Sequence, residues 1–256
     1  MNPMKKNLLY FLFPLLFLVS ACNNKSDTPT PSQAPSPNIV STKILPIGAS
    51  RVAGNRPEYE SFRYELWKLL LDDNLHFDFI GSVKDEASYP IYKNQSFDPD
   101  HEGGRGGTSE QILTALTESI DPIVSQLGTP EVVLFSTPGG NDALQKLSFE
   151  NAVQNVNAII DILQSKNPNV TIIIEQMAPP RADTESDVLD FMMQMNAEVV
   201  NIAASQSTAT SKVMVIDMAT GFTDALLADQ VHYNEAGARF IAARYYDQIK
   251  DLIRMK

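Results

Sequence analysis

The sequence contains a single cysteine, Cys22, and fewer basic residues than acidic ones. One cysteine excludes a disulfide within the chain. The 20 Lys and Arg residues against 31 Asp and Glu give a formal net charge of -11, and the basic residues form no stripe. Such a chain repels nucleic acid on average, so we expect no nucleic-acid partner.

Several motifs of common ligand sites are also missing. The sequence has no G-x-x-x-x-G-K-[ST] phosphate loop, and no G-x-G-x-x-G turn follows the first predicted strand. The G-x-S-x-G elbow of α/β-hydrolases is absent as well. The acidic stretch DPDHE, residues 98–102, lacks a recognised metal-ligand spacing. We interpret it as a solvated loop and predict no metal site.

Long hydrophobic runs are scarce, and the longest lies at the N-terminus. Residues 8–21 follow Lys5 and Lys6 and form an apolar run that is short for a bilayer span but typical of a signal peptide. The run leads into LVSAC, which resembles the lipobox of bacterial lipoproteins. This resemblance implies a signal peptide over residues 1–21 and acylation of Cys22. The alternative is an ordinary signal peptide with Cys22 as a free thiol.

We therefore expect an exported bacterial lipoprotein that is anchored to a membrane only by its N-terminal lipid, facing the periplasm or displayed at the cell surface. Residues 22–38 are rich in Pro, Ser and Thr and contain almost no apolar residues, so they predict a flexible tether. The remaining residues, 39–256, suit one globular domain with a sizeable core. We expect this domain to be a monomer.

Strands and helices alternate along the domain. Continuous apolar runs, typical of a parallel sheet that is covered on both faces, predict five strands, at 39–48, 76–82, 131–139, 170–177 and 212–218. Helical spacing of apolar residues predicts five helices, at 57–73, 109–128, 149–168, 188–206 and 234–253.

This alternation predicts an α/β fold, namely a doubly wound, three-layer α/β/α (flavodoxin-like) domain with a central five-stranded parallel sheet. Ligands of such sheets bind beyond the carboxyl ends of the strands. We therefore expect the functional residues in the segments that directly follow each strand.

Two of these segments hold groups suited to nucleophilic catalysis. Ser50 follows the first predicted strand, although a serine at such a position is by itself more often a turn or helix-cap residue than a nucleophile. In DQVH, Asp229 and His232 are three residues apart, so one turn of chain can direct the carboxylate to Nδ1 and leave Nε2 free for a serine hydroxyl. The alternative is that Asp229 caps the next helix and His232 lies on the surface.

Two glycine-rich segments could supply hydrogen-bond donors to an oxyanion. In STPGGND, Gly139 and Gly140 allow a sharp turn that would point the amide of Asn141 into the cleft. In HEGGRGG, the glycines around Gly106 would leave backbone N–H groups free. Both segments could equally be plain turns.

Taken together and in order, four segments resemble the conserved blocks of the SGNH (GDSL-type) hydrolase superfamily. They are LPIGAS, HEGGRGG, GGND and DQVH. The resemblance implies a catalytic triad of Ser50, His232 and Asp229, and an oxyanion hole made by the backbone N–H groups of Ser50 and Gly106 with the amide of Asn141. It also implies that no metal or cofactor takes part.

Within this superfamily, the segments ILPIGAS, YESFRYELWKLL and DMATGF look most similar to acetylxylan-esterase-like carbohydrate esterases. That resemblance implies removal of acetyl groups from an acylated glycan or another small ester. Three positions depart from the pattern of these families. Ala49 stands where the first block has an aspartate, and Gly104 stands where these esterases often have a second histidine. Tyr233 stands where a proline usually follows the catalytic histidine. The alternatives are a lysophospholipase or thioesterase with the same machinery, and a glycan-binding lipoprotein with vestigial catalytic residues.

Overall fold

The computed structural model describes residues 40–255, and the predicted signal peptide, the tether and Cys22 lie outside them. The described residues form eight strands: β1 (Thr42–Gly48), β2 (Leu75–Phe79), β3 (Val83–Lys84), β4 (Asp100–Gly103), β5 (Val132–Phe135), β6 (Thr171–Gln176), β7 (Lys212–Asp217) and β8 (Arg254–Met255).

The described helices alternate with these strands. They are α1 (Ser50–Ala53), α2 (Arg63–Asp72), α3 (Ser109–Gln126), α4 (Gly140–Leu144), α5 (Phe149–Lys166), α6 (Ser186–Gln206) and α7 (Glu235–Ile249), with two short 3₁₀ turns at Asp224–Leu226 and Lys250–Leu252.

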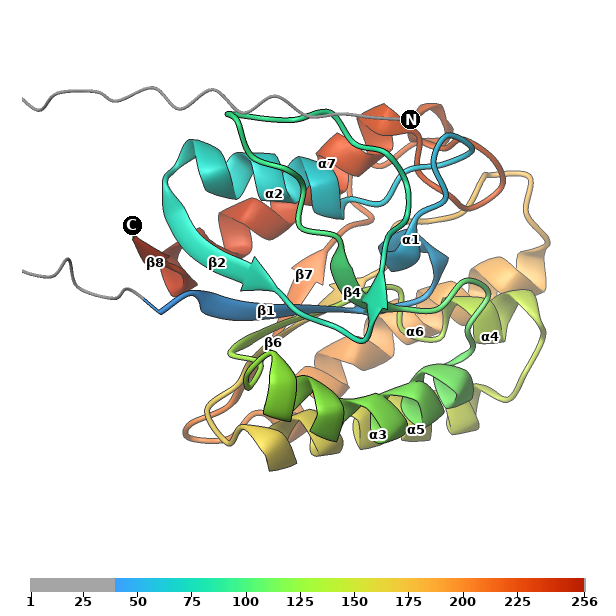
Figure 1. Cartoon of the computed structure of the whole chain (residues 1–256). Helices are drawn as coiled ribbons and strands as arrows, with labels where there is room; N and C mark the ends of the chain where they lie inside the picture. The colour runs from blue at the N-terminus through green and yellow to red at the C-terminus, as the bar shows by residue number, and fades with distance from the viewer. Residues whose placement is uncertain (1–39, 256) are drawn as a thin grey trace, which may run out of the picture. The chain divides into compact units, whose positions relative to one another are not determined.

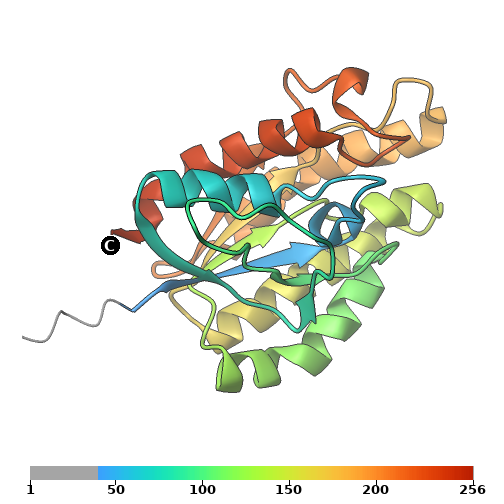
Figure 2. The same ribbon diagram turned by 45° about the horizontal axis from the view of Figure 1, so that its top comes forward.

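All five predicted strands are present and pair in parallel in the order β2-β1-β5-β6-β7. This order is that of flavodoxin-like sheets, in which the chain winds outward in both directions from its first strand. The predicted three-layer α/β/α fold is confirmed, with α2 and α7 on one face of the sheet and α3, α5 and α6 on the other (Figures 1 and 2).

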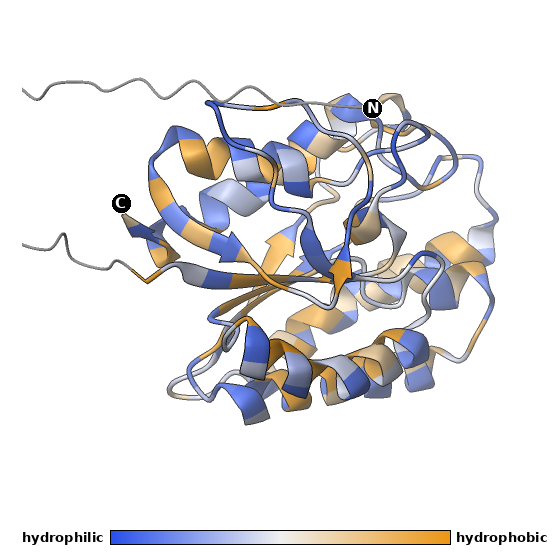
Figure 3. Ribbon diagram, viewed as in Figure 1, coloured by the Kyte–Doolittle hydropathy of each residue, from blue (hydrophilic) through white to orange (hydrophobic). Residues whose placement is uncertain are grey.

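Alternate residues of the buried strands face opposite layers. On β5, for example, Val132 and Leu134 belong to the core beneath α2 and α7, whereas Val133 and Phe135 belong to the core beneath α3, α5 and α6. Successive side chains of a strand point to opposite faces, so a continuous apolar run fills both cores at once. In Figure 3 the apolar strands accordingly lie between helices whose outer faces are hydrophilic.

The sheet is wider than the five strands predicted from sequence. β4 pairs in parallel with the end of β1, β3 pairs antiparallel with β4, and β8 pairs antiparallel with β2. The interpretation of DPDHE as a solvated loop is therefore wrong, because Asp100, His101 and Glu102 lie in β4 and are buried. Glu102 accepts hydrogen bonds from Ser82 N and Ser119 Oγ, His101 Nδ1 accepts one from Gly103 N, and Asp100 forms an ion pair with Lys84 at 3.2 Å.

The helix predicted from residue 57 begins instead at Arg63. Residues 56–58 form a turn that is closed by a bridge between Asn55 and Tyr59, and Glu60 N donates to Tyr233 O at 2.8 Å. These tertiary contacts override the helical spacing of the sequence. They also bring Tyr59 next to the segment that contains His232, as described below.

The carboxyl ends of β1, β5 and β6 lie at one edge of the sheet, beside α1 and α4 (Figure 1). The side chains that follow these strands can therefore meet at one place. Among residues 40–255, no helix is sufficiently long and apolar to cross a membrane. That same part of the chain contains no group of three or more His, Cys, Asp or Glu side chains arranged to hold a metal ion.

Asp98, just before β4, makes the stability of the fold depend on pH. Burial raises the pKa of its carboxyl from 3.8 to about 6, although Phe79 N donates to it at 2.7 Å. Because the folded state holds the proton more tightly than the unfolded state, this contribution to stability is complete below pH 3.8 and is lost as the pH rises through about 6.

We therefore expect Asp98→Asn, which removes the charge and keeps an acceptor for Phe79 N–H, to stabilise the fold at pH 8 by roughly 1 to 2 kcal/mol more than at pH 4.5. Urea unfolding at the two pH values measures this difference. Asp161→Asn, at an exposed position on α5, is the control. An equal effect of Asp98→Asn at both pH values would contradict the prediction.

Candidate active site

Ser50 lies at the carboxyl edge of the sheet, where a ligand site is expected. It is the first residue of α1, directly beyond β1, and its side chain is almost fully buried. The structure brings His232 and Asp229 to this position from the loop that precedes α7.

The three side chains form a continuous chain of hydrogen bonds. His232 Nε2 lies 2.8 Å from Ser50 Oγ, and His232 Nδ1 lies 2.7 Å from Asp229 Oδ2. A carboxylate on Nδ1 fixes the tautomer in which Nε2 is free to accept the serine proton. The three groups thus have the connectivity needed to activate a serine hydroxyl.

A tight turn of backbone holds the carboxylate in place. The Oδ1 atom of Asp229 accepts hydrogen bonds from the backbone N–H groups of Val231 and His232, at 2.9 and 2.8 Å. Burial raises the pKa of Asp229, but these hydrogen bonds and the one to the imidazole outweigh it, and the pKa lies below its ordinary value. Asp229 is therefore ionised at neutral pH. The cap of α7 is Asn234 and not Asp229.

One neighbour of the imidazole was not predicted from sequence. The ring of Tyr59 stacks on His232 with 3.8 Å between ring centroids and 11° between planes. A parallel ring at this distance limits rotation of the imidazole and offers its π face to the imidazolium form. Nothing local in the sequence indicates this role, because Tyr59 reaches the site through the pairing of Glu60 with Tyr233.

The three predicted oxyanion donors differ in their hydrogen bonding. The backbone N–H groups of Ser50 and Gly106 donate to no acceptor within residues 40–255, so both are available to a ligand. Asn141 lines the same small pocket as Ser50, and its Nδ2 donates one hydrogen bond to Gly107 O at 2.9 Å. This bond ties the two predicted oxyanion segments together and leaves the second N–H of the amide unused.

Asp142, next to Asn141, is a second residue that sequence reasoning missed. It is buried and accepts hydrogen bonds from the backbone N–H and the hydroxyl of Ser109, at 2.8 and 2.7 Å. Ser109 begins α3, which follows the segment of Gly106. Asp142 thus fixes the start of α3 relative to α4.

A third such residue, Glu175, lies beneath the site. It is fully buried on β6 and accepts hydrogen bonds from Thr137 N at 2.8 Å and from Tyr245 OH at 2.6 Å. Burial raises the pKa of Glu175. Thr137, which follows β5, has a φ of 53°, a conformation that threonine rarely adopts and that the hydrogen bond from its N–H supports. The left-handed Gly139, with a φ of 71°, then turns the chain into α4.

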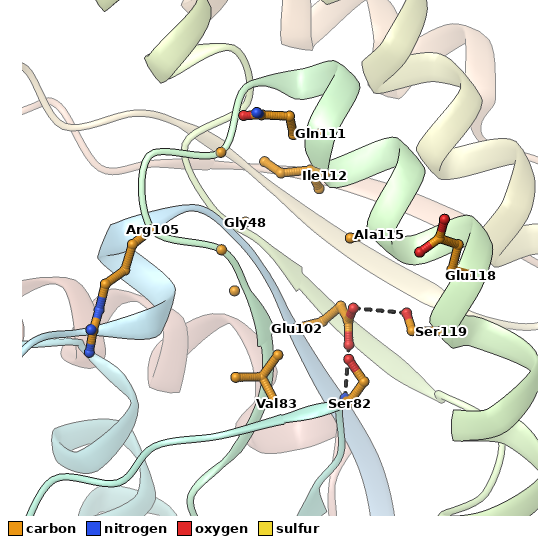
Figure 4. Close-up of a pocket in the computed structure, with 13 residues that line it drawn as sticks. Gly48, Ser82, Val83, Glu102, Arg105, Gln111, Ile112, Ala115, Glu118 and Ser119 are labelled. Carbon is orange, nitrogen blue, oxygen red and sulfur yellow. Dashed lines mark hydrogen bonds between the residues drawn. The ribbon is translucent and has the colours of Figure 1, made fainter.

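A small pocket and a larger cavity lie at the site. The pocket that Ser50 and Asn141 line has a volume of about 20 Å³, room for little more than one water-sized group, and Leu144, Met192 and Val231 close it. A larger cavity of about 490 Å³ lies between β4 and α3 (Figure 4). Gly48 and Gly107 line this cavity, so it adjoins both the strand that precedes Ser50 and the segment that bonds Asn141.

A serine, a histidine and an aspartate connected in this way on an α/β/α fold have the geometry of a serine hydrolase. The sequence profile of the GDSL-like Lipase/Acylhydrolase family matches residues 94–240, more than half of the chain. The protein belongs to this family. The matched range contains Gly106, Asn141, Asp229 and His232, and Ser50 precedes it.

Solved structures of carbohydrate esterases are similar over nearly the whole domain. A family 3 carbohydrate esterase from Talaromyces cellulolyticus is 26% identical with a TM-score of 0.68, covering 82% of this chain and 97% of that chain. A family 3 carbohydrate esterase from Clostridium thermocellum is 28% identical with a TM-score of 0.65, covering 82% and 96%. A lipase/acylhydrolase from Enterococcus faecalis, at 18% identity and a TM-score of 0.57 over 84% and 98%, shares the fold. No match was found among curated protein sequences.

The geometry predicts that Ser50 is unusually reactive for a serine. We expect a fluorophosphonate probe to label Ser50 stoichiometrically, and His232→Ala to slow labelling by at least about 100-fold, because the hydroxyl loses its base. Mass spectrometry of the labelled peptide measures both. His76→Ala, at a histidine outside the site, is the control and should label at the wild-type rate. Labelling that does not depend on His232 would contradict the prediction.

Proposed function

We propose that this protein is a serine esterase that removes acetyl groups from carbohydrate esters. The observation that carries the proposal is the hydrogen-bonded connection of Ser50 Oγ, His232 and Asp229 at the carboxyl edge of the sheet. Membership of an acylhydrolase family and the likeness to carbohydrate esterases at 26% and 28% identity support it.

In the proposed mechanism, His232 takes the proton of Ser50 while Ser50 Oγ attacks the ester carbonyl. Asp229 stabilises the imidazolium that forms. The backbone N–H groups of Ser50 and Gly106 and the amide of Asn141 donate to the oxyanion. His232 then protonates the sugar oxygen that leaves, and water cleaves the acyl-enzyme by the same route.

The size of the pocket beside Ser50 favours a short acyl group. At about 20 Å³ it matches a methyl group better than a longer chain. The sugar must then lie outside it, and the 490 Å³ cavity beside Gly107 offers room for a neighbouring sugar. The lining of that cavity includes polar groups of Arg105, Gln111 and Ser119, which can bind hydroxyls.

A specific observation favours a second candidate, a lysophospholipase or thioesterase. Leu144 on α4 lines the acyl pocket and is nevertheless 37% exposed. Exposed apolar side chains at a pocket rim suit a longer acyl chain. The length of the acyl group that is hydrolysed distinguishes the two candidates.

We expect residues 39–256 to release acetate from acetylated glycans, and to hydrolyse nitrophenyl esters with a kcat/KM that falls steeply beyond about four acyl carbons. Ser50→Ala should abolish both activities, and Ser125→Ala, at an exposed serine on α3, should leave them unchanged. A kcat/KM that rises with chain length would favour the second candidate. Wild-type turnover by Ser50→Ala would refute both.

The larger cavity gives a separate test of glycan binding. Gly104 lines the cavity and a Cβ there would meet no atom within 4 Å, so Gly104→Trp adds its side chain at the cavity wall without a clash at Cβ. We expect this variant to lower the ratio of kcat/KM on an acetylated polysaccharide to kcat/KM on nitrophenyl acetate by about 10-fold, because binding energy remote from the ester is lost. Gly104→Ala is the matched control. An unchanged ratio in Gly104→Trp would exclude the cavity from glycan binding.

A further inference from the structure

Arg51 is a charged residue buried directly beside the candidate nucleophile. It follows Ser50 in α1, its exposed fraction is 4%, and it takes no part in the triad or the oxyanion donors. Arginine stays protonated in proteins, so this is a buried positive charge adjacent to the reacting hydroxyl. A buried charge needs partners, and the partners of Arg51 are distant in sequence.

Its hydrogen bonds go to the backbone of two segments that border the site. Nε donates to Val231 O at 2.8 Å, and Nη1 donates to Ala178 O at 2.8 Å. Val231 directly precedes His232, and Ala178 lies just beyond β6. The guanidinium also lies over the ring of Tyr233, at 4.7 Å from its centroid.

Arg51 thus contacts both chain neighbours of His232. A guanidinium is planar and its N–H groups point in fixed directions, so two hydrogen bonds and one stacked ring define the position of the segment 231–233 relative to α1. Ser50 and Arg51 are joined by one peptide bond, so the same contacts define the position of the imidazole relative to the hydroxyl. Tyr59 stacks on the imidazole itself.

We propose that Arg51 is a positioning residue that sets the 2.8 Å contact between His232 Nε2 and Ser50 Oγ by holding the backbone on both sides of the histidine. This inference rests on the proposed esterase function. Lysine cannot replace Arg51 fully, because a single ammonium group lacks the planar set of donors that reaches both carbonyls.

A merely structural role for Arg51 makes a different prediction. If the side chain only fills the core beneath α7, its replacement lowers stability, and each folded molecule still turns over at the wild-type rate. If it positions the histidine, kcat falls in folded molecules while KM changes little, because substrate binding does not depend on the contact between His232 and Ser50.

The experiment compares Arg51→Lys and Arg51→Met with the wild type. We measure kcat and KM on nitrophenyl acetate, the rate of fluorophosphonate labelling of Ser50, and the thermal midpoint. Misplacement of a catalytic group by about 1 Å can cost about 100-fold in rate, so we expect kcat and labelling to fall by about 100-fold in Arg51→Met and about 10-fold in Arg51→Lys. KM should stay within about threefold of the wild type, as expected when ground-state binding is intact.

Ile160→Ala is the matched control. Ile160 is fully buried on α5 in the core on the other face of the sheet, so its truncation lowers stability without touching the site. The number of active sites is counted by fluorophosphonate labelling. A wild-type kcat per active site in both Arg51 variants would overturn the inference. A loss of kcat no greater than that of Ile160→Ala at equal destabilisation would also overturn it. If Arg51→Met does not fold, Arg51→Lys decides. A wild-type protein that neither labels nor hydrolyses esters would refute the proposed function itself.

Discussion

The hydrogen bond between His232 and Ser50 joins residues 182 positions apart in the chain. It depends on one constraint, the parallel alignment of β1, β5, β6 and β7, which places the ends of these strands at a common edge. Ser50 follows β1, and the loop that contains His232 follows β7. In a right-handed, doubly wound sheet the chain returns to the opposite edge after every strand, so each successive strand ends beside the previous one. Segments that are remote in sequence thereby deliver a hydroxyl, backbone donors and an amide to one place.

Polar groups beneath this edge keep the arrangement rigid. Glu175 holds the strained Thr137, Asp142 holds the start of α3, and the guanidinium of Arg51 holds the carbonyls of two loops. Each of these side chains is buried, and each satisfies backbone groups that no helix or strand would satisfy. Such contacts are costly to break, because the loss of one partner leaves a buried polar group without a hydrogen bond. The loops around Ser50 are therefore fixed by polar contacts and not by apolar packing alone.

The two cavities at the site differ greatly in volume, as the two halves of an ester can differ in size. A pocket for a very small group lies at Ser50, and a much larger cavity lies a few residues away along the segment that contains Gly106. A short acyl group matches the small pocket, and a bulky alcohol requires a space as large as the second cavity. Ala49 and Gly104 both lie at this boundary, where the chain departs from the block pattern of the superfamily. Ala49 is buried in the small pocket, and Gly104 leaves open space in the large cavity.

The sequence by itself determined the layers of the fold and the identity of the proposed reacting groups. Continuous apolar runs identify the five parallel strands because each run fills two cores, and the spacing of Asp229 and His232 identifies a carboxylate and an imidazole that one turn of chain can connect. Tertiary structure alone decided the rest. Strand β4 was missed because its charged residues are buried with partners from other segments, and the helix expected from residue 57 begins later because Glu60 pairs with Tyr233. Arg51 and Asp142 are chain neighbours of predicted site residues, but their hydrogen-bond partners are far away in the chain, as are the contacts of Tyr59 and Glu175. Local sequence patterns contain no record of such distant partners.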